Sequence, residues 1–289
     1  MSTLMGKRVI LTGASRGLGL ALAAALAKAG ADLALWARDR DALVRAQTLA
    51  EADRLDAGQA IRHYPVDLAD LDAVERTTHQ ALADFGGSVD VVINNAAIQG
   101  PLGRFHNVDW LSWLGVFQVN LFAAARVCQL AIPAMRAQGR GKIINLSGGG
   151  ATGPRPDVSA YGASKAALVR LSETLAEELR EDHIDVNCVA PGAMNTRMLT
   201  EVLAAGPGGV QGEYERAQRQ AESGGTPPEN AAEVVVWLAS EASDGITGRL
   251  ISAVWDDWAR LGERREALAK TDVYTLRRIV PKDRGLDWG

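Results

Sequence analysis

Short apolar runs alternate along the chain with longer segments in which apolar positions recur at helical spacing. Strands buried on both faces read as continuous apolar runs, and the helices between them cover the two faces of the sheet. The pattern therefore predicts an α/β fold, a doubly wound (Rossmann) parallel sheet of seven strands with helices on both faces. The expected strands are Val9–Leu11, Leu33–Trp36, Ile61–Tyr64, Val89–Ile93, Ile143–Leu146, Val186–Val189 and Leu250–Val254.

A glycine-rich turn, Thr12-Gly-Ala-Ser-Arg-Gly-Leu-Gly19, follows the first strand and precedes an alanine-rich helical segment. Gly13 can take backbone angles closed to other residues, and Gly17 and Gly19 let the chain approach a pyrophosphate at the helix N-terminus. Strand, glycine turn and helix together indicate the start of a nucleotide-binding βαβ unit. The spacing differs from the GxGxxG fingerprint, and an ordinary strand-to-helix turn is the alternative.

A tyrosine and a lysine stand four residues apart in Tyr161-Gly-Ala-Ser-Lys165, which places both on one face of a helix. Leucines at helical spacing from Leu168 to Leu179 predict that this helix is long and amphipathic. Because a nearby cation favours phenolate over phenol, we expect Lys165 to lower the pKa of Tyr161. A chance pairing on an ordinary helix is the alternative.

Together the two motifs resemble the short-chain dehydrogenase/reductases, in the single-domain branch that carries TGxxxGxG and YxxxK. The resemblance covers about residues 6–254. Further motifs agree in order along the chain: Asp67-Leu68, Asn94-Asn-Ala-Ala97, Asn120, Pro191-Gly192 and Thr196.

The resemblance implies a nicotinamide cofactor. It places Asp67 and Leu68 near the adenine, Asn94 and Ala96 along the cofactor trough, and Thr196 at the nicotinamide amide. The full cofactor-binding set that it implies is Gly13, Ser15, Arg16, Gly17, Leu18, Gly19, Arg38, Asp67, Leu68, Asn94, Ala96, Tyr161, Lys165, Pro191, Gly192 and Thr196.

The end of the second strand favours NADP(H) over NAD(H). An acidic residue there would bind the ribose hydroxyls, but alignment to the family puts Ala37 at that position, followed by Arg38. Arg16 adds a second cation, and a guanidinium can bind phosphate through two hydrogen bonds. In the alternative, Arg38 pairs with Asp39 or Asp41 and the chain uses NAD(H).

The resemblance also implies a reaction, the NADP(H)-dependent interconversion of a ketone or aldehyde with an alcohol by hydride transfer. Tyr161 would be the acid/base, Lys165 would hold the nicotinamide ribose, and Asn120 would help to position a water beside Lys165. A serine usually binds the substrate oxygen. It stands thirteen residues before the tyrosine, where this chain has Gly148.

The donor at this position is therefore open. Ser147 could serve if the flexible glycines from Gly148 to Gly150 let the strand end slip by one residue, and we lean slightly to this. An unshifted Ser147 would point away, because a strand alternates its faces. An unusual donor, with Thr152 and Ser159 in the following loop, or no donor at all, are the alternatives.

A missing donor also leaves an alternative function. Losing one such donor can cost a factor of about 100 to 1000 in rate. The alternative is a catalytically weak, nucleotide-binding regulatory or structural protein, although the intact Tyr161 and Lys165 count against it. Sugar-nucleotide epimerisation in the extended branch is disfavoured, because that branch carries TGxxGxxG.

Composition narrows the classes of partner. A net charge of -4, with acidic and basic residues mixed, argues against nucleic acid. The sequence shows no continuous apolar span and no signal peptide, so we expect a soluble, cytoplasmic protein without a membrane partner. Cys128 and Cys188 stand in apolar contexts as small core residues, and the 4 histidines lack ligand spacing, so we expect no metal.

The chain is expected to form one domain over residues 1–254, with a C-terminal extension over 255–289. The resemblance makes about 197–226 a substrate lid, in which the glycine-rich segment 204–212 has little means of ordering itself. A plain disordered surface loop is the alternative. We expect a homodimer or homotetramer that acts on a small carbonyl or alcohol substrate. The extension should pack on this subunit or another, because it holds too many large aromatics for a free tail: Trp255, Trp258, Tyr274 and Trp288.

Overall fold

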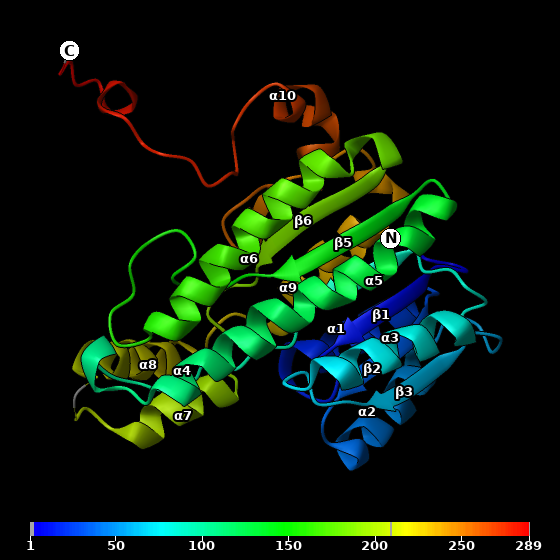
Figure 1. Ribbon diagram of the computed structural model, residues 1–289, viewed down its shortest axis with the longest axis horizontal. Coiled ribbons are helices and arrows are strands. Elements are labelled where there is room, and N and C mark those ends of the chain that lie inside the picture. Colours follow the sequence, from blue (N-terminus) through cyan, green and yellow to red (C-terminus); the bar gives the residue numbers. More distant parts are fainter. Residues whose placement is uncertain (1–2, 209, 289) are drawn as a thin grey trace.

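A computed structural model describes residues 3–208 and 210–288, and within them seven strands form one parallel sheet (Figure 1). The strand order is β3-β2-β1-β4-β5-β6-β7, so the predicted doubly wound parallel sheet is confirmed. The strands are β1 (Arg8–Thr12), β2 (Asp32–Ala37), β3 (Ile61–Pro65), β4 (Val91–Asn94), β5 (Gly141–Leu146), β6 (Ile184–Ala190) and β7 (Leu250–Ser252).

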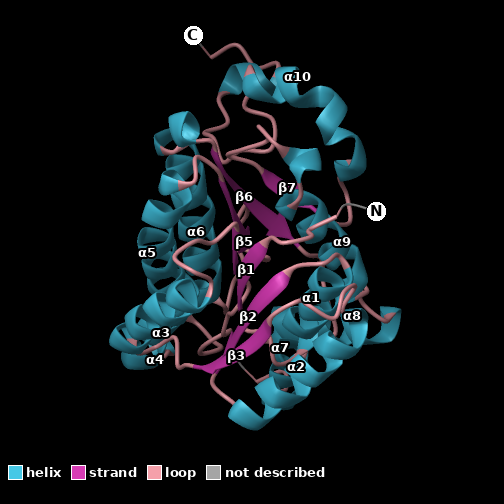
Figure 2. Ribbon diagram, turned by 90° about the vertical axis from the view of Figure 1, so that its right-hand side faces the viewer, coloured by secondary structure: helices cyan, strands magenta, loops and turns pink. Residues whose placement is uncertain are grey.

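Helices cover both faces of the sheet (Figure 2). On one face α1, α2 and α9 pack together, and on the other α3 packs on α5 while α6 packs on β6. The helices are α1 (Gly17–Lys28), α2 (Arg40–Asp53), α3 (Leu71–Asp84), α4 (Trp110–Phe117), α5 (Ala123–Ala137), α6 (Ser159–Glu178), α7 (Arg197–Ala205), α8 (Gln211–Ser223), α9 (Pro228–Ala239) and α10 (Arg265–Ala269).

The core consists of two apolar layers, one on each side of the sheet. Within β1, Val9 and Leu11 face the layer that contains α1 and α9, while Ile10 faces the layer that contains α3 and α5. Because both faces are covered, both sets of alternating strand positions are apolar. The strand order reverses between β1 and β4. In sheets of this kind, ligands bind at such a switch point, beyond the carboxyl ends of the strands.

A helical run joins α4 to α5 through a π-helical turn at Gln118–Phe122, which holds Asn120. π-Helical turns inside α-helices are frequent at functional sites. By length and composition alone, the run Trp110–Ala137 could cross a membrane, contrary to the expectation that the chain has no such span. In this fold its α5 half packs against α3 and the sheet.

The segment expected to be a lid consists of α7 and α8, which pack on each other. Its glycine-rich stretch is a short connection between α7, which ends at Ala205, and α8, which begins at Gln211. Position 209 lies outside the described residues. The polar stretch from Glu213 to Ser223 is ordered as helix, because it turns Glu213 and Ala217 inward.

The C-terminal extension has two parts. Up to Leu276 it packs on the domain, with Leu261 and Leu268 buried in the layer of α9. The buried guanidinium of Arg249 donates to the backbone carbonyls of Leu268, Thr271 and Val273. From residue 277 onward the chain leads away from the domain (Figure 1), and Trp288 is 76% exposed.

Candidate functional site

The glycine turn after β1 is held by close packing of its own backbone. Gly13 has a φ of +69°, and a Cβ there would lie 2.8 Å from the Cα of Ala96. A Cβ on Gly19 would lie 1.9 Å from the carbonyl oxygen of Gly13. Gly19 is therefore required by packing inside the turn, and not only by approach to a ligand as the sequence suggested. Gly17, with a φ of +54°, borders open space, with only Thr196 nearby.

Thr12 and Asn95, for which the sequence predicted no role, stabilise this turn by hydrogen bonds. The side-chain amide of Asn95 donates to the carbonyl oxygens of Thr12, at 2.9 Å, and Gly13, at 3.2 Å. In return, the hydroxyl of Thr12 accepts from the backbone N–H groups of Asn95 and Ala96, both at 3.1 Å. The pair of asparagines at the end of β4 was the available signal in the sequence.

Asn94, the first of the two asparagines, points to the other side of β4. Its amide is buried and donates to Asn145 Oδ1 at 2.8 Å and to the sulfur of Cys128 at 3.3 Å. The structure therefore does not bring the side chain of Asn94 to the glycine turn, although the resemblance placed it along the trough. Adjacent strand residues face opposite ways, so the two asparagines serve different layers.

Two cationic side chains lie at the edge of the turn. Arg16 is exposed at the N-terminus of α1, and Arg38 is exposed just after β2. Arg38 Nη1 lies 4.0 Å from Asp67 Oδ2, a loose pair between two exposed groups. Asp39 caps α2 by accepting from the Ala42 N–H at 2.9 Å. Among the described residues, the carboxylate paired with Arg38 is that of Asp67, and not that of Asp39 or Asp41, the two partners named in the alternative.

The remaining residues of the implied cofactor set vary in exposure. Ser15 is partly exposed in the turn, but the side chains of Leu18 and Leu68 are buried in the two apolar layers. Pro191 and Gly192 follow β6, and Thr196 is the residue immediately before α7. The structure thus brings Thr196 to the glycine turn from the distant lid segment.

Tyr161 and Lys165 lie on one face of α6, near the carboxyl end of β5. The ammonium of Lys165 is buried, donates to the carbonyl oxygen of Leu146 at 2.6 Å, and lies 5.8 Å from the centre of the Tyr161 ring. Burial lowers the pKa of Lys165 to about 8, because the neutral amine is easier to desolvate.

The pKa of Tyr161 differs from the expectation that Lys165 lowers it. Burial raises the pKa of Tyr161, because the phenolate would lose its hydration. The positive charge that opposes this rise is that of Arg155, in the loop between β5 and α6. The sequence-based expectation of a lowered pKa was therefore wrong.

Both the oxygen and the nitrogen of the Asn120 side-chain amide form hydrogen bonds with other residues of the protein. Its Oδ1 accepts from the Ile98 N–H at 2.8 Å, and its Nδ2 donates to the carbonyl oxygen of Ile98 at 2.9 Å and to the Ser164 hydroxyl at 3.1 Å. These contacts tie the segment after β4 to α6, one residue from Lys165. The π-helical turn therefore positions the helix that carries the Tyr–Lys pair.

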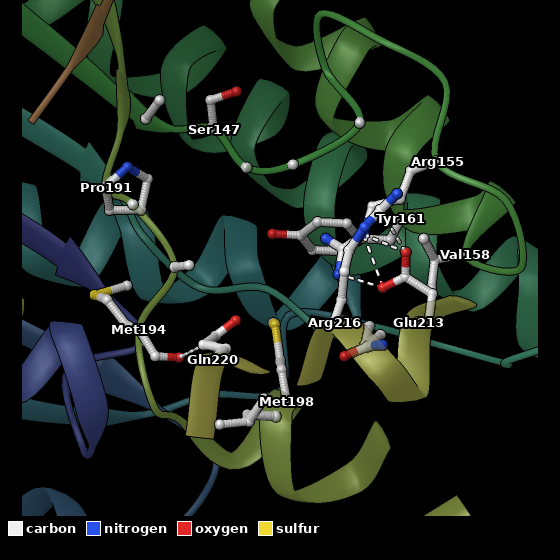
Figure 3. Close-up of a pocket in the computed structure, with 18 of the residues that line it drawn as sticks. Ser147, Arg155, Val158, Tyr161, Pro191, Met194, Met198, Glu213, Arg216 and Gln220 are labelled. Carbon is white, nitrogen blue, oxygen red and sulfur yellow. Dashed lines mark hydrogen bonds and ion pairs between the residues drawn. The ribbon is translucent and has the colours of Figure 1, made fainter. Parts of the chain in front are cut away.

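The end of β5 shows no one-residue slip. The Ser147 N–H donates to the carbonyl oxygen of Val189 at 2.8 Å, which continues the pairing in which Leu146 faces Val189. A Cβ on Gly148 would lie 2.2 Å from the Tyr161 hydroxyl oxygen, so Gly148 is the residue that faces it. The buried hydroxyl of Ser147 has no hydrogen-bond partner among the described residues and is turned away from Tyr161 in Figure 3.

A cavity of about 660 Å³ opens beside Tyr161. Its walls come from the ends of β5 and β6, the loop between β5 and α6, the lid helices α7 and α8, and Trp255 (Figure 3). Arg155, from the loop, pairs with Glu213, from α8, and both line the cavity. Sequence reasoning missed this pair, because no local pattern links residues so far apart.

The described residues form neither a metal site nor a reactive thiol. Within residues 3–208 and 210–288, no group of three or more His, Cys, Asp and Glu side chains converges as a metal site would. Cys128 and Cys188 are buried free thiols. Burial raises the pKa of each thiol to about 12, which leaves both protonated and unreactive at neutral pH.

Comparisons with known proteins give consistent matches. A family model described as enoyl-(acyl carrier protein) reductase matches residues 13–253. The 3-oxoacyl-(acyl-carrier-protein) reductase FabG of Chlamydia trachomatis is 31% identical over 252 residues, which is 86% of this chain and 96% of that protein.

Two solved structures share the fold and differ in cofactor. NAD⁺-bound xylitol dehydrogenase is similar with a TM-score of 0.75 and 28% identity, covering 86% of this chain and 98% of that one. A Beutenbergia cavernae protein, proposed to be an NAD(P)-dependent gluconate 5-dehydrogenase and holding NADP at low occupancy, gives a TM-score of 0.76 and 29% identity over 87% of this chain and 96% of that one.

Proposed function

The chain belongs to the short-chain dehydrogenase/reductase family of oxidoreductases, and we propose that it is an NADP(H)-dependent enzyme that interconverts a ketone or aldehyde with an alcohol. One observation carries the proposal: Tyr161 borders a cavity of about 660 Å³, with Lys165 held behind it by the carbonyl of Leu146. A positioned phenol beside a substrate-sized cavity is suited to general acid/base chemistry.

The residues around the glycine turn fit a dinucleotide. The open space at Gly17 lies at the N-terminus of α1, where backbone N–H groups and the helix dipole favour a pyrophosphate. Arg16 and Arg38 are both exposed, one at the start of α1 and one just after β2, and in this proposal they bind the ribose phosphate. When bound, the nicotinamide cofactor supplies or accepts the hydride at the substrate carbon.

Tyr161 moves the proton in this proposal. In reduction, its hydroxyl donates a proton to the carbonyl oxygen, which becomes the alcohol oxygen, and the phenolate that is left recovers a proton from solvent. In oxidation, the tyrosine removes the proton of the alcohol. Lys165 would hold the nicotinamide ribose, and its ammonium charge would favour the transient phenolate.

Replacing the tyrosine tests the activity. We expect Tyr161→Phe to abolish turnover and leave NADPH affinity nearly unchanged, because it deletes the proton donor without touching the glycine turn. Activity is measured as NADPH oxidation against a panel of ketones, aldehydes, sugars and quinones, and affinity by fluorescence quenching. A variant that keeps most of its rate would mean that Tyr161 is not the acid.

The preference for NADP(H) is supported by Arg16 and Arg38, which could bind a 2′-phosphate. We expect NADPH to bind more tightly than NADH, and Arg38→Ala to narrow the difference. Arg45→Ala, at another exposed position on α2, is the matched control and should leave both dissociation constants unchanged. Equal affinities of the unaltered protein for NADPH and NADH would overturn this preference.

A second candidate is a catalytically weak, nucleotide-binding regulatory protein on the same scaffold. The observation that favours it is Gly148, which faces the Tyr161 hydroxyl without any side chain that could donate to a substrate oxygen. Tight NADPH binding with negligible turnover of every carbonyl in the panel would support this candidate over the enzyme.

The proposal also includes a cytoplasmic location and a homodimer or homotetramer. Supporting a homo-oligomer, Phe105, Trp110 and Leu111 gather around the start of α4 and are 61%, 55% and 76% exposed. Large exposed apolar patches of this kind mark interaction surfaces. Light scattering of the purified protein gives the number of subunits, and a monomer would exclude the oligomer.

A further inference from the structure

Two guanidinium groups share one carboxylate in the wall of the cavity beside Tyr161 (Figure 3). The side chain of Glu213 is only 2% exposed. It accepts from Arg155 Nε at 2.9 and 3.0 Å, from Arg155 Nη2 at 2.6 Å, and from Arg216 Nη1 at 2.9 Å. The cluster therefore carries two positive charges and one negative charge, which leaves an excess of one positive charge.

Donors in the cavity are left without protein acceptors. The Nη1 group of Arg155 has no hydrogen-bond acceptor among the described residues, because Glu213 occupies the Nε and Nη2 side of the guanidinium. The buried side-chain nitrogen of Gln99, which also lines the cavity, has no partner among them either. A buried donor without an acceptor, such as the Gln99 nitrogen, is costly. Arg155 is partly exposed, with 28% of its side chain accessible. Both groups are therefore suited to a ligand that brings acceptor oxygens into the cavity.

Arg155 lies close to the reacting position. Its charge opposes the effect of burial on the pKa of Tyr161. A Cβ on Gly149 would lie 2.9 Å from Arg155 Nη1, so glycine at 149 leaves room for the guanidinium. Arg155 therefore stands next to the backbone position at which the family's serine is missing.

We propose that Arg155, oriented by Glu213 and supported by Arg216, binds the carboxylate of the substrate, so that the enzyme acts on oxo acids and the corresponding hydroxy acids. This inference rests on the proposed function. A single carboxylate neutralises the excess charge of the cluster, and a planar guanidinium matches its two oxygens. Apolar side chains of the lid, Met198, Leu199 and Val202, line the rest of the cavity and suit a carbon chain.

The test compares acids with their uncharged esters. The probes are 3-oxobutanoate, 4-oxopentanoate and 5-oxohexanoate, each beside its methyl ester, because the series varies the spacing between carboxylate and carbonyl. For at least one of these pairs, kcat/KM for the acid should be about 10-fold or more above kcat/KM for its methyl ester. Arg155→Gln should lower kcat/KM for that acid about 100-fold and kcat/KM for its ester far less, because both substrates depend on the pKa of Tyr161 but only the acid carries the anionic group. Arg219→Gln, at an exposed position of α8, is the matched control.

Binding without turnover separates this inference from the proposed function. Hexanoate, which has no reactive carbonyl, should bind to the unaltered protein saturated with NADP⁺ when measured by calorimetry. It should fail to bind to Arg155→Gln. Hexanamide, which is uncharged, should bind to neither of these two proteins. If hexanoate binds only when Arg155 is present, but the protein reduces no carbonyl in the panel, then the anion-binding site is supported and the proposed oxidoreductase activity is wrong. Ester turnover equal to acid turnover, or an equal loss of both in Arg155→Gln, would overturn the inference and leave the oxidoreductase activity standing.

The fold of the variant is checked separately. NADPH affinity and melting temperature of Arg155→Gln show whether the cofactor site and the domain are intact. Arg155→Lys keeps the charge and loses the planar fork, so it should recover part of the preference for the acid. If Arg155→Lys is no better than Arg155→Gln with the acid, the charge of this residue does not select the substrate, and the inference fails.

Discussion

Lys165 is a buried ammonium group whose only hydrogen-bond acceptor among the described residues is the carbonyl of Leu146. Burial lowers its pKa from 10.5 to about 8, so the folded protein releases this proton before the unfolded chain does. Between those two pH values the unfolded chain holds more protons, and folding is increasingly favoured as pH rises. Through this one buried side chain, the free energy of unfolding of the ligand-free protein should increase as the pH rises into the alkaline range.

This linkage predicts a difference between the unaltered protein and Lys165→Met. From pH 8 to pH 10, the free energy of unfolding of the unaltered protein should rise relative to the variant by about 1 kcal/mol per pH unit. Urea unfolding at several pH values measures it, and the shared groups cancel in the comparison. A constant difference across this range would show that Lys165 is not neutralised near pH 8.

Gly148 gives a second prediction at the scale of one residue. A side chain there would overlap the Tyr161 hydroxyl, whose distance from a Cβ would be 2.2 Å, so Gly148→Ala should displace the phenol and lower kcat about 100-fold. Gly148→Ser should show a similar loss, and Ser147→Ala should stay near the unaltered rate, because the Ser147 hydroxyl points away. A large loss in Ser147→Ala, measured as NADPH oxidation, would restore Ser147 as the donor.

At the scale of elements, two successive glycines after α8 join the lid helices to the domain, and one of them is crowded. Gly225 has a φ of +68°, and a Cβ there would lie 2.7 Å from Asn195 Oδ1. Its neighbour Gly224 also has a positive φ, at +82°, but borders open space. Gly224→Ala and Gly225→Ala therefore both place an alanine at a positive φ and strain the backbone, but only Gly225→Ala also crowds a side chain next to the lid.

Comparing the two variants isolates the position of the lid. Gly225→Ala should raise KM for the carbonyl substrate several-fold more than Gly224→Ala, because it pushes α8 away from the cavity while NADPH affinity is kept. Steady-state kinetics with both variants provide the measurement. Identical KM values would mean that the lid position does not depend on this contact.

The elements were largely predictable, because most of the strands are apolar runs and α6 carries apolar residues at helical spacing. The side-chain contacts of the site were less so. Asn94 and Asn95 are adjacent in sequence and serve opposite faces of the sheet, which a motif does not reveal. Arg155 and Glu213 meet only because the lid folds over the loop before α6. The pKa of Tyr161 depends on burial, which the sequence leaves undetermined.

At the scale of the whole molecule, the C-terminal extension completes one end of the core. Removing all residues after Trp258 would expose the layer that buries Leu261 and Leu268 and would leave the Arg249 guanidinium without its carbonyl acceptors. We expect this truncation to destabilise the protein by at least about 3 kcal/mol. Truncation after Leu276 should leave the melting temperature unchanged, because the removed residues lead away from the domain.

Thermal unfolding of the two truncated proteins measures this difference, and light scattering shows whether either one changes the number of subunits. If truncation after Trp258 left the melting temperature intact, the extension would be an appendage of the domain. A change of mass after truncation at Leu276 would assign residues 277–289 to a subunit contact.

The hydrogen bonds from Asn95 to the turn after β1 also bear on the order in which the protein matures during synthesis. Thr12 and Gly13 are made early, but the amide that fixes their carbonyls arrives only with the end of β4. A growing chain therefore cannot present a finished nucleotide turn until Asn95 has left the ribosome and β4 has paired with β1. A bound nucleotide can therefore protect the nascent protein from proteases only after Asn95 has emerged and β4 has paired with β1.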